Sequence, residues 1–450
     1  MTELLDLCYD VLIRILEALN PADLAACAAT SSSFHEFIKR NKRLYKAHYL
    51  QNFDDPRRRT TDAEPDWVEE LQKAVRWQKI LESADNDLKR TEFPFILSTS
   101  LSLISTASLS PTDHSHNAST ISRLFLNISQ NHNAFMSRSS LYTRAGTELQ
   151  RPADTPSGQQ LSAKLHCLFG IPSSHVGRRV LSAHPFARAK VYDLRNYSEE
   201  TGWGPFLGDG TFKVDWEMVE SLMIVLGYNS GLCCRRFQPR FSPPWAKPLQ
   251  GVVRERAKPG DRAWEAGGVD VPLKMRDPFN VGGVWSRIVC FLDYNDLYAF
   301  NFSDSALKHP ASEPRDPLVT DEAIRHIIMD IKVTAITPSE DTSYPIVEFS
   351  GTSRSVDAAW DPNANSKIRG SVRMTSEGEV RWQTISVFYG GEERWRSEGI
   401  QVGGIGAQRG VIGTWFDKDF DPHGPAGPTA FWKISDQNLA DYGEDGEEEE

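Results

Sequence analysis

Acidic and imidazole side chains occur close together at two places in this sequence and could ligate a cation. The segment from Asp417 to Asp421 holds three carboxylates in five residues, and His423 follows two residues later. Carboxylate oxygens suit hard cations such as Ca²⁺, but Asp, Gly and Pro at this density are also typical of a tight loop between strands. His114 and His116 have no third ligand at a useful spacing. We therefore expect no metal site at either place.

Nucleophiles and phosphate-binding loops are the other groups that could do chemistry. The adjacent thiols of Cys233 and Cys234 could form a reactive pair, although packed thiols are the simpler interpretation. The sequence contains no His-Glu-x-x-His, Walker A or Gly-x-Ser-x-Gly motif. A dinucleotide-binding glycine fingerprint begins at Gly404, but Arg409 occupies its third glycine position. Ser230 lies near two glycines but not at the spacing of a nucleophile elbow. The sequence thus favours a non-catalytic protein that needs no cofactor.

Composition and charge argue against several classes of partner. The chain has 450 residues and a formal net charge of −11, and seven of its carboxylates lie in residues 441–450. Nucleic-acid binding needs a clustered positive field, which this charge distribution does not predict. The sequence shows neither a secretory signal nor an apolar run near the ~20 residues that span a bilayer. Six cysteines without a Cys-x-x-Cys pair indicate a reducing compartment. We expect a soluble protein of the cytoplasm, the nucleus or both, with neither nucleic acid nor membrane as partner.

The first ~50 residues are patterned as three short helices that would present an apolar surface. The apolar positions of the first helix are Val11, Leu12, Ile15, Leu16 and Leu19. Asn20 can cap the next helix and Pro21 suits its first position, with Leu24 as its main apolar anchor. A capping-box pattern at Ser33 begins the third helix. Three helices this short cannot bury so many large side chains alone, so a partner or the rest of the chain must cover them.

These residues resemble an F-box. The family opens with Leu-Pro-x-Asp/Glu-Val/Ile-Leu, continues with Pro-x-Asp-Leu and ends with Leu-Trp-Lys; the chain has Cys8 at the first Pro and Tyr45 at the Trp. The resemblance implies binding to the adaptor Skp1 and, through it, to a cullin. The residues that it implies at the Skp1 interface are Leu7, Val11, Leu12, Ile15, Leu16, Leu19, Pro21, Leu24, Phe34, Leu44 and Tyr45.

Two other interpretations of the amino-terminal segment remain. An amphipathic three-helix subdomain could pack on the rest of the protein without any partner. A helix-turn-helix that binds DNA is suggested by the basic run from Lys39 to Arg43. Such a run is also typical of a solvated helix end, and the acids of the segment nearly balance its bases.

The middle of the chain is less informative. Residues 54–65 are charged and broken by proline, and residues 66–88 carry an apolar stripe that predicts a helix. Residues 98–122 are rich in Ser and Thr, which fits a loop or a phosphorylated segment. Apolar, densely packed elements begin near residue 161. Residues 239–268 read as an exposed loop that carries Trp245 and Trp264, two candidates for target recognition.

The carboxy-terminal part, residues 281–434, reads as antiparallel β-structure. Apolar and polar residues alternate over 367–374, 380–388 and 395–402, with turn signals between them. Further strand candidates are residues 284–292, 297–302, 324–336 and 346–349. Seven or more sequential strands favour a meander that closes into a barrel or sandwich. Two Gly-x-Trp units place Trp285 and Trp415 as candidates for barrel-closing or target-binding residues.

Longer strings after residue 160 resemble an uncharacterised family of fungal F-box proteins; they include residues 277–287, 291–297, 396–403 and 413–428. A more distant resemblance is to metazoan F-box-only proteins with a lipocalin-like barrel, such as a cyclin D receptor. We expect an α+β protein with a three-helix F-box and helical linker before a lipocalin-like barrel. The expected domains are an F-box over 1–53, a linker with a Ser/Thr-rich loop over 54–160, a substrate-binding body over 161–434 and an acidic tail over 435–450.

The leading hypothesis for function is a substrate-recognition subunit of a Skp1–cullin–F-box ubiquitin ligase. Its F-box would bind Skp1 and its barrel would present an unknown target protein, while its partners supply the chemistry. One alternative is a Skp1-bound sensor or carrier whose barrel holds a small apolar ligand. A large dry cavity in the barrel would favour that alternative, whereas a filled barrel with a groove would favour peptides. An enzyme built on the barrel would need titratable groups that converge in one pocket.

Overall fold

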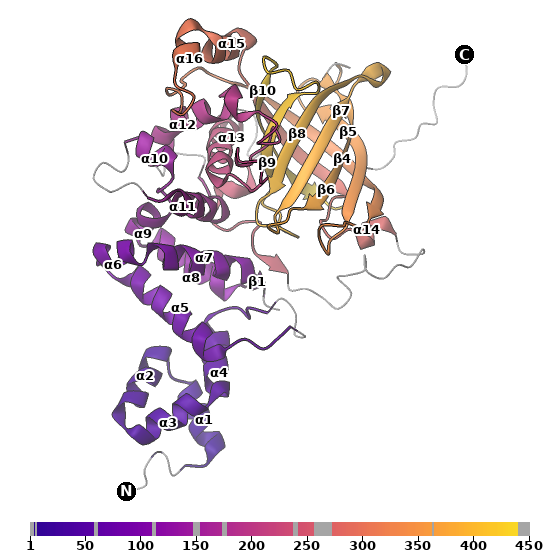
Figure 1. Cartoon of the computed structure of the whole chain (residues 1–450). Coiled ribbons are helices and arrows are strands. Elements are labelled where there is room, and N and C mark those ends of the chain that lie inside the picture. Colours follow the sequence, from indigo (N-terminus) through magenta and orange to yellow (C-terminus); the bar gives the residue numbers. More distant parts are fainter. Residues whose placement is uncertain are drawn as a thin grey trace. The chain divides into compact units, whose positions relative to one another are not determined.

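The computed structural model of the chain describes residues 4, 7–57, 62–109, 114–146, 154–172, 178–236, 242–255, 272–361 and 364–439. The chain forms two compact units. The first comprises Met1–Phe135 with Val253–Lys258, and the second comprises Met136–Val252 with Pro259–Glu450. Figure 1 shows the helices of the first unit in indigo to magenta and the strands of the second in orange to yellow. No helix in the described ranges is long and apolar enough to cross a membrane.

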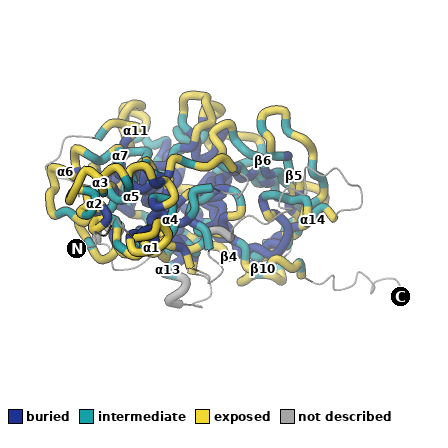
Figure 2. The backbone as a smooth tube through the Cα atoms, turned by 90° about the horizontal axis from the view of Figure 1, so that it is seen from below, coloured by how far each residue is buried: buried dark blue, intermediate teal, exposed yellow. Residues whose placement is uncertain are grey.

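The first unit begins with four short helices, where the sequence predicted three. They are α1 (Tyr9–Glu17), α2 (Pro21–Thr30), α3 (Ser32–Arg40) and α4 (Lys42–Asn52). The Asn20 side chain accepts a hydrogen bond from the Asp23 backbone N–H at 2.8 Å, which is the predicted cap of α2. The cap of α3 is Ser31, which accepts from the Phe34 N–H at 3.2 Å, so the capping box expected at Ser33 is wrong by two residues. Much of the surface of α1 is exposed (Figure 2).

The rest of the first unit is also mainly helical. It contains α5 (Trp67–Glu82), α6 (Asn86–Thr91), α7 (Phe93–Thr106), α8 (His116–Leu126) and α9 (Ser129–Phe135), and β1 (Ser108–Leu109) pairs in parallel with β2 (Arg254–Glu255). Most of the described Ser/Thr-rich segment is therefore helical. Leu103, Ile104 and Ile121 are buried there, and this burial outweighs the weak helix propensity of serine and threonine.

Asp54 joins the four amino-terminal helices to the helices that follow. Its carboxylate is 6% exposed and accepts hydrogen bonds from the Ser115 hydroxyl at 2.5 Å and from the backbone N–H groups of Ser108 and His116. Its own N–H donates to the Asn117 side chain at 3.0 Å. The start of the segment predicted to be a linker is thus a fixed junction, because a buried carboxylate needs all of these donors.

The second unit combines a helical layer with a barrel. Its helices are α10 (Ser140–Arg144), α11 (Pro156–Phe169), α12 (Arg178–Val191), α13 (Trp216–Arg236), α14 (Leu273–Arg276), α15 (Tyr294–Phe302) and α16 (Asp304–Lys308), with 3₁₀ turns η2 (Leu194–Asn196), η4 (Pro244–Ala246) and η6 (Tyr389–Gly391). Helix α13 packs on α11 and α12 and on the outer wall of the barrel (Figure 1). Leu222, Val225 and Leu226 of α13 have no exposed surface, which is typical of a helix buried between two layers.

A buried histidine in this helical layer makes the stability of the fold depend on pH. His184 of α12 is 6% exposed and stacks on Tyr228 with ring centroids 4.0 Å apart. Burial, with a smaller contribution from Arg188, lowers the pKa of His184 from 6.5 to about 3. Between these values the unfolded chain binds more protons than the folded chain, so stability falls as the pH falls below about 6.5.

We expect His184 alone to cost about 2 kcal/mol of stability at about pH 5, relative to neutral pH. Denaturant unfolding across this pH range would measure the loss. The variant His184→Phe keeps the stacked ring without the titrating nitrogen and should show a correspondingly shallower dependence. If the unfolding free energies of the native chain and of His184→Phe depended equally on pH, His184 would not be the source of the loss.

Eight antiparallel strands form the closed barrel, which confirms the predicted fold class. They are β3 (Gly283–Phe291), β4 (Ala323–Thr337), β5 (Ile346–Ser355), β6 (Ser366–Met374), β7 (Val380–Val387), β8 (Glu393–Gln401), β9 (Val411–Asp417) and β10 (Ala426–Ser435). Each strand pairs with the next, and β10 pairs with β3. The strand expected at residues 297–302 is wrong, because this segment belongs to α15. The Asp293 side chain caps that helix, and Leu297 and Asn301 form its buried face.

Four aromatic rings fill one level of the barrel interior. Trp382 lies 5.2 Å from Trp285, 5.4 Å from Phe431 and 5.6 Å from Phe349, measured between ring centroids. All four are at most 4% exposed, and the Trp382 indole N–H donates to the Gln401 side chain at 3.0 Å. We call these four residues the aromatic layer. It accounts for much of the apolar burial in the barrel core.

Candidate functional site

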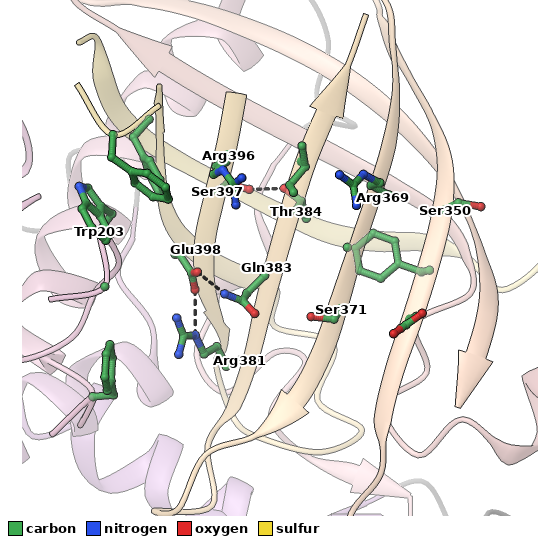
Figure 3. Close-up of a pocket in the computed structure, with 18 of the residues that line it drawn as sticks. Trp203, Ser350, Arg369, Ser371, Arg381, Gln383, Thr384, Arg396, Ser397 and Glu398 are labelled. Carbon is green, nitrogen blue, oxygen red and sulfur yellow. Dashed lines mark hydrogen bonds and ion pairs between the residues drawn. The ribbon is translucent and has the colours of Figure 1, made fainter. Parts of the chain in front are cut away.

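A hollow of about 640 Å³ lies against strands β5 to β9, and most of its floor consists of side chains on the outer wall of the barrel. We call it the outer groove (Figure 3). The strand register sets its floor in two rows, since directly paired residues share a face. The first row is Ser350, Arg369, Ile385, Arg396 and Phe416, and the second is Glu348, Ser371, Gln383 and Glu398. Trp203 and Phe212 from the loop before α13 and Phe420 from the β9–β10 loop complete its lining.

One side of the outer groove is held by an ion pair. Glu398 is 7% exposed and receives the Arg381 Nε–H at 2.8 Å and the Gln383 side-chain N–H at 2.5 Å (Figure 3). The Arg381 guanidinium also contacts the Phe206 and Phe212 rings, at 5.0 and 5.4 Å from their centroids. These contacts fix the side chains before any ligand arrives.

The other side of the groove carries a cation, Arg396, that forms no ion pair with any carboxylate in the described part of the chain. The Arg396 Nε–H donates to the Lys418 carbonyl at 3.2 Å, and the guanidinium lies 5.1 Å from the Phe420 ring centroid. Its terminal N–H groups have no acceptor among the residues that the structure describes. Arg369, in the same row, is paired with Glu393. The groove thus combines an available guanidinium, hydroxyls, the Glu348 carboxylate and aromatic walls, a set of groups that can bind a folded or extended peptide.

Three of the four tryptophans proposed for target recognition are described, and none of these three lines the groove. Trp285 and Trp415 are 4% and 8% exposed, and their indole N–H groups donate to the carbonyls of Val281 and Cys290. Trp245 has no exposed surface, so the expectation of an exposed loop around it is wrong. It packs edge-on against Trp432, with ring centroids 5.7 Å apart. Trp264 lies outside the described residues.

Trp203 is the tryptophan that reaches the groove, and sequence reasoning missed it. Its ring lies 4.2 Å from the Phe420 ring, and its backbone has a φ of 55°, in the left-handed region. The only signal in the sequence is the Trp-Gly-Pro-Phe string that begins at Trp203, a pattern that indicates packing rather than binding.

Asp417, Asp421, His114 and His116 are not among the residues that line the groove. Asp417 and Asp421 each accept a hydrogen bond from a backbone N–H two residues later, as loop-stabilising aspartates do. His114 and His116 lie with their ring centroids 5.7 Å apart. In the described part of the chain, no three His, Cys, Asp or Glu side chains are placed to hold a metal ion. The side chains of Cys233 and Cys234 lie outside the described residues.

The amino-terminal helices enclose a core of their own. Leu12, Leu16, Leu24 and Leu44 are at most 4% exposed and pack together with Ile38. The other apolar side of α1 faces solvent. Val11 and Ile15 of α1, and Leu7 just before it, repeat every four residues and are 45%, 38% and 38% exposed. We call Leu7, Val11 and Ile15 the apolar strip. An exposed strip of this kind on a short helix marks a binding surface.

Residues 4–51 match the family of F-box-like domains. The match covers the four amino-terminal helices, with their core and the apolar strip, and ends within α4. Neither curated proteins nor solved structures show a significant match to the chain.

The eleven residues predicted to face Skp1 fall into three groups by how far each is buried in the F-box-like domain. The three residues of the apolar strip are exposed, and Leu19, Pro21, Phe34 and Tyr45 are partly buried. Leu12, Leu16, Leu24 and Leu44 are buried in the core of the domain. Tyr9, at 52% exposed, stands beside the strip, and its hydroxyl accepts from the Asn41 side chain at 2.9 Å. The sequence did not single it out.

Proposed function

We propose that the protein is a substrate-recognition subunit of a Skp1–cullin–F-box ubiquitin ligase. Its F-box-like domain binds Skp1, and through Skp1 a cullin, in the cytoplasm, the nucleus or both. The observation that carries this proposal is the F-box-like match over residues 4–51 together with the exposed apolar strip on α1. Such a subunit contributes proximity and orientation, and the other subunits supply the catalytic groups.

The outer groove is the surface that we propose for the target protein. The aromatic layer fills one level of the barrel interior, which argues against a large apolar ligand there. The groove, by contrast, is open, polar and walled by aromatic rings, as peptide-binding surfaces often are. Its floor lies on paired strands, which hold the side chains more rigidly than loops would.

Co-purification tests the first part of the proposal. The native chain, expressed with Skp1 and a cullin, should elute with both in one complex of equal stoichiometry. A chain that folds but never captures Skp1 would refute the assignment. Comparison of the proteins that accumulate when the gene is deleted would then identify the targets.

A charge reversal in the outer groove tests the second part. We expect Arg396→Glu to weaken target capture by about 30-fold, because a carboxylate replaces the available cation at a hot-spot position worth roughly 2 kcal/mol. Skp1 capture should be unchanged. The matched control is Arg354→Glu on the exposed outer face of β5, away from the groove lining. In cells without the native gene, Arg396→Glu should leave the target proteins as abundant as the deletion does, while Arg354→Glu should restore their degradation. If both variants restored degradation of the target proteins, the outer groove would be ruled out as the target-binding surface.

A further inference from the structure

The inner wall of the barrel carries an arginine that has no carboxylate partner among the described residues. Arg287 of β3 pairs with Phe431 and Ile327, two residues of the barrel core, and therefore points inward with them. It is 5% exposed, and burial lowers its pKa from 12.5 to about 10. The Arg287 Nε–H donates to the Thr429 hydroxyl at 2.9 Å. No other acceptor for its guanidinium lies among the described residues.

An arginine in this position opposes folding. A buried charge is strongly unfavourable unless a carboxylate or several acceptors compensate for lost water. One hydroxyl satisfies only one of the five N–H groups of a guanidinium. Methionine or leucine would fill the same space without this cost. The arginine therefore points to a requirement other than stability.

The surroundings of Arg287 differ from the aromatic layer next to it. One step along each strand from the aromatic layer, toward the end of the barrel where β3 finishes, most inward positions are small or hydroxylated. They are Gly351, Gly370, Thr384, Ser397, Gly413 and Thr429, with Ile327 beside Arg287. One further step along the strands, the inward positions include Ser353 and Ser386 but also the bulky Ile368, Trp395 and Trp415. The hydroxyls of Thr384 and Ser397 are hydrogen-bonded to each other (Figure 3). An eight-stranded barrel is just wide enough to be filled by side chains or to hold one small ligand, and this level contains far less side-chain volume than the aromatic layer.

We propose that Arg287 anchors an internal binding site for a small molecule that carries an oxyanion, either a carboxylate or a phosphate. With Nε held by Thr429, the two terminal nitrogens remain to bind two oxygens of the anion in parallel. The nearby hydroxyls can donate to the same anion or accept from substituents of the ligand. Because the aromatic layer closes the barrel beyond Arg287, the ligand is compact and has no long apolar chain directed past the arginine. Gly370, Thr384 and Ser397 also border the outer groove, but Arg287 does not. The site therefore stands independently of the proposed function.

Binding to the full-length chain tests the site. The probes are hexanoate, inorganic phosphate and the neutral hexanamide, each measured by calorimetry and by the shift in melting temperature at up to about 10 mM. We expect saturable binding of at least one anion and none of hexanamide. Preference for hexanoate would identify a carboxylate ligand, and preference for phosphate would identify a phosphate ester.

Two variants make the test specific to Arg287. We expect Arg287→Met to lose anion binding by at least about 10-fold, and its melting temperature without ligand should equal or exceed that of the native chain. Arg287→Lys keeps the charge but cannot form two parallel bonds, so it should also bind at least about 10-fold more weakly. Arg354→Met, on the outer wall, is the control and should bind as the native chain does.

Three results would overturn the proposal. The first is absence of binding by both anions, the second is equal affinity in the native chain and in both Arg287 variants, and the third is a ligand-free Arg287→Met chain that melts well below the native one. An Arg287→Met chain that does not fold has the same meaning as the third result, and Arg287→Lys still measures the loss or retention of anion binding.

Discussion

Replacing Val11 and Ile15 by aspartate is expected to abolish Skp1 capture while the F-box-like domain stays folded. Both side chains are more than a third exposed, so neither contributes to the core around Leu16. A carboxylate in the centre of an apolar interface would have to be desolvated without a partner. Truncation of one central apolar side chain commonly costs roughly 2 kcal/mol or more at an interface, so two charged replacements should weaken binding by about 1,000-fold or more.

Two control variants separate binding from folding in this experiment. Gln51→Asp adds the same charge to the exposed side of α4 and should leave Skp1 capture unchanged. Leu16→Ala removes a side chain with no exposed surface and should destabilise the domain by about 2–5 kcal/mol. Circular dichroism and capture of Skp1 from purified components would be measured for each. Full capture by Val11→Asp with Ile15→Asp would show that Skp1 binds elsewhere or not at all.

The largest loss of stability is expected for Trp382→Ala in the barrel. This side chain is 1% exposed, contacts the three other rings of the aromatic layer and donates a hydrogen bond to Gln401. Its removal leaves a large cavity and an unpaired amide oxygen, which together should cost about 3–5 kcal/mol.

Denaturant unfolding of the full chain, followed by circular dichroism of the strands and by hydrogen exchange, would assign the loss to the barrel. Trp360→Ala is the matched control, because Trp360 is 83% exposed and its removal should change stability by less than about 0.5 kcal/mol. A change below about 1 kcal/mol for Trp382→Ala would mean that the barrel refills the space, which close packing makes unfavourable.

The barrel and the helical start could be predicted from the sequence because both rest on local patterns. Apolar and polar residues alternate around Ile368 and Trp382, and in the structure these two face into the barrel and their polar neighbours face out. Residues 297–302 defeated the same reasoning because a capping aspartate and a buried asparagine outweigh the β-propensity of their aromatic residues. Trp245 was expected on a loop surface, yet tertiary packing against Trp432 buries it.

The two surfaces of α1 show a different limit of sequence reasoning. Leu12 and Val11 are adjacent, apolar and equally consistent with the F-box pattern, but one is buried and the other is exposed. Which side faces the core depends on where α3 and α4 pack, and no local spacing gives that. The outer groove was beyond prediction for a similar reason, because Trp203 and Arg396 are separated by nearly two hundred residues and meet only through the barrel. Arg287 was also missed, because what makes it unusual is its lack of an acidic partner among the described residues, which a sequence does not show.

The pairing of the first barrel strand with the last has a consequence for synthesis of the chain. Strand β3 leaves the ribosome long before β10, and until residues 426–435 emerge both β3 and β9 have an unpaired edge. Free edges recruit other strands, so the unfinished barrel is prone to association with neighbouring nascent chains. Any truncation before residue 426 would make that state permanent. We therefore expect nonsense mutations even late in the gene to yield an insoluble product, whereas loss of residues 440–450 alone would leave the barrel closed.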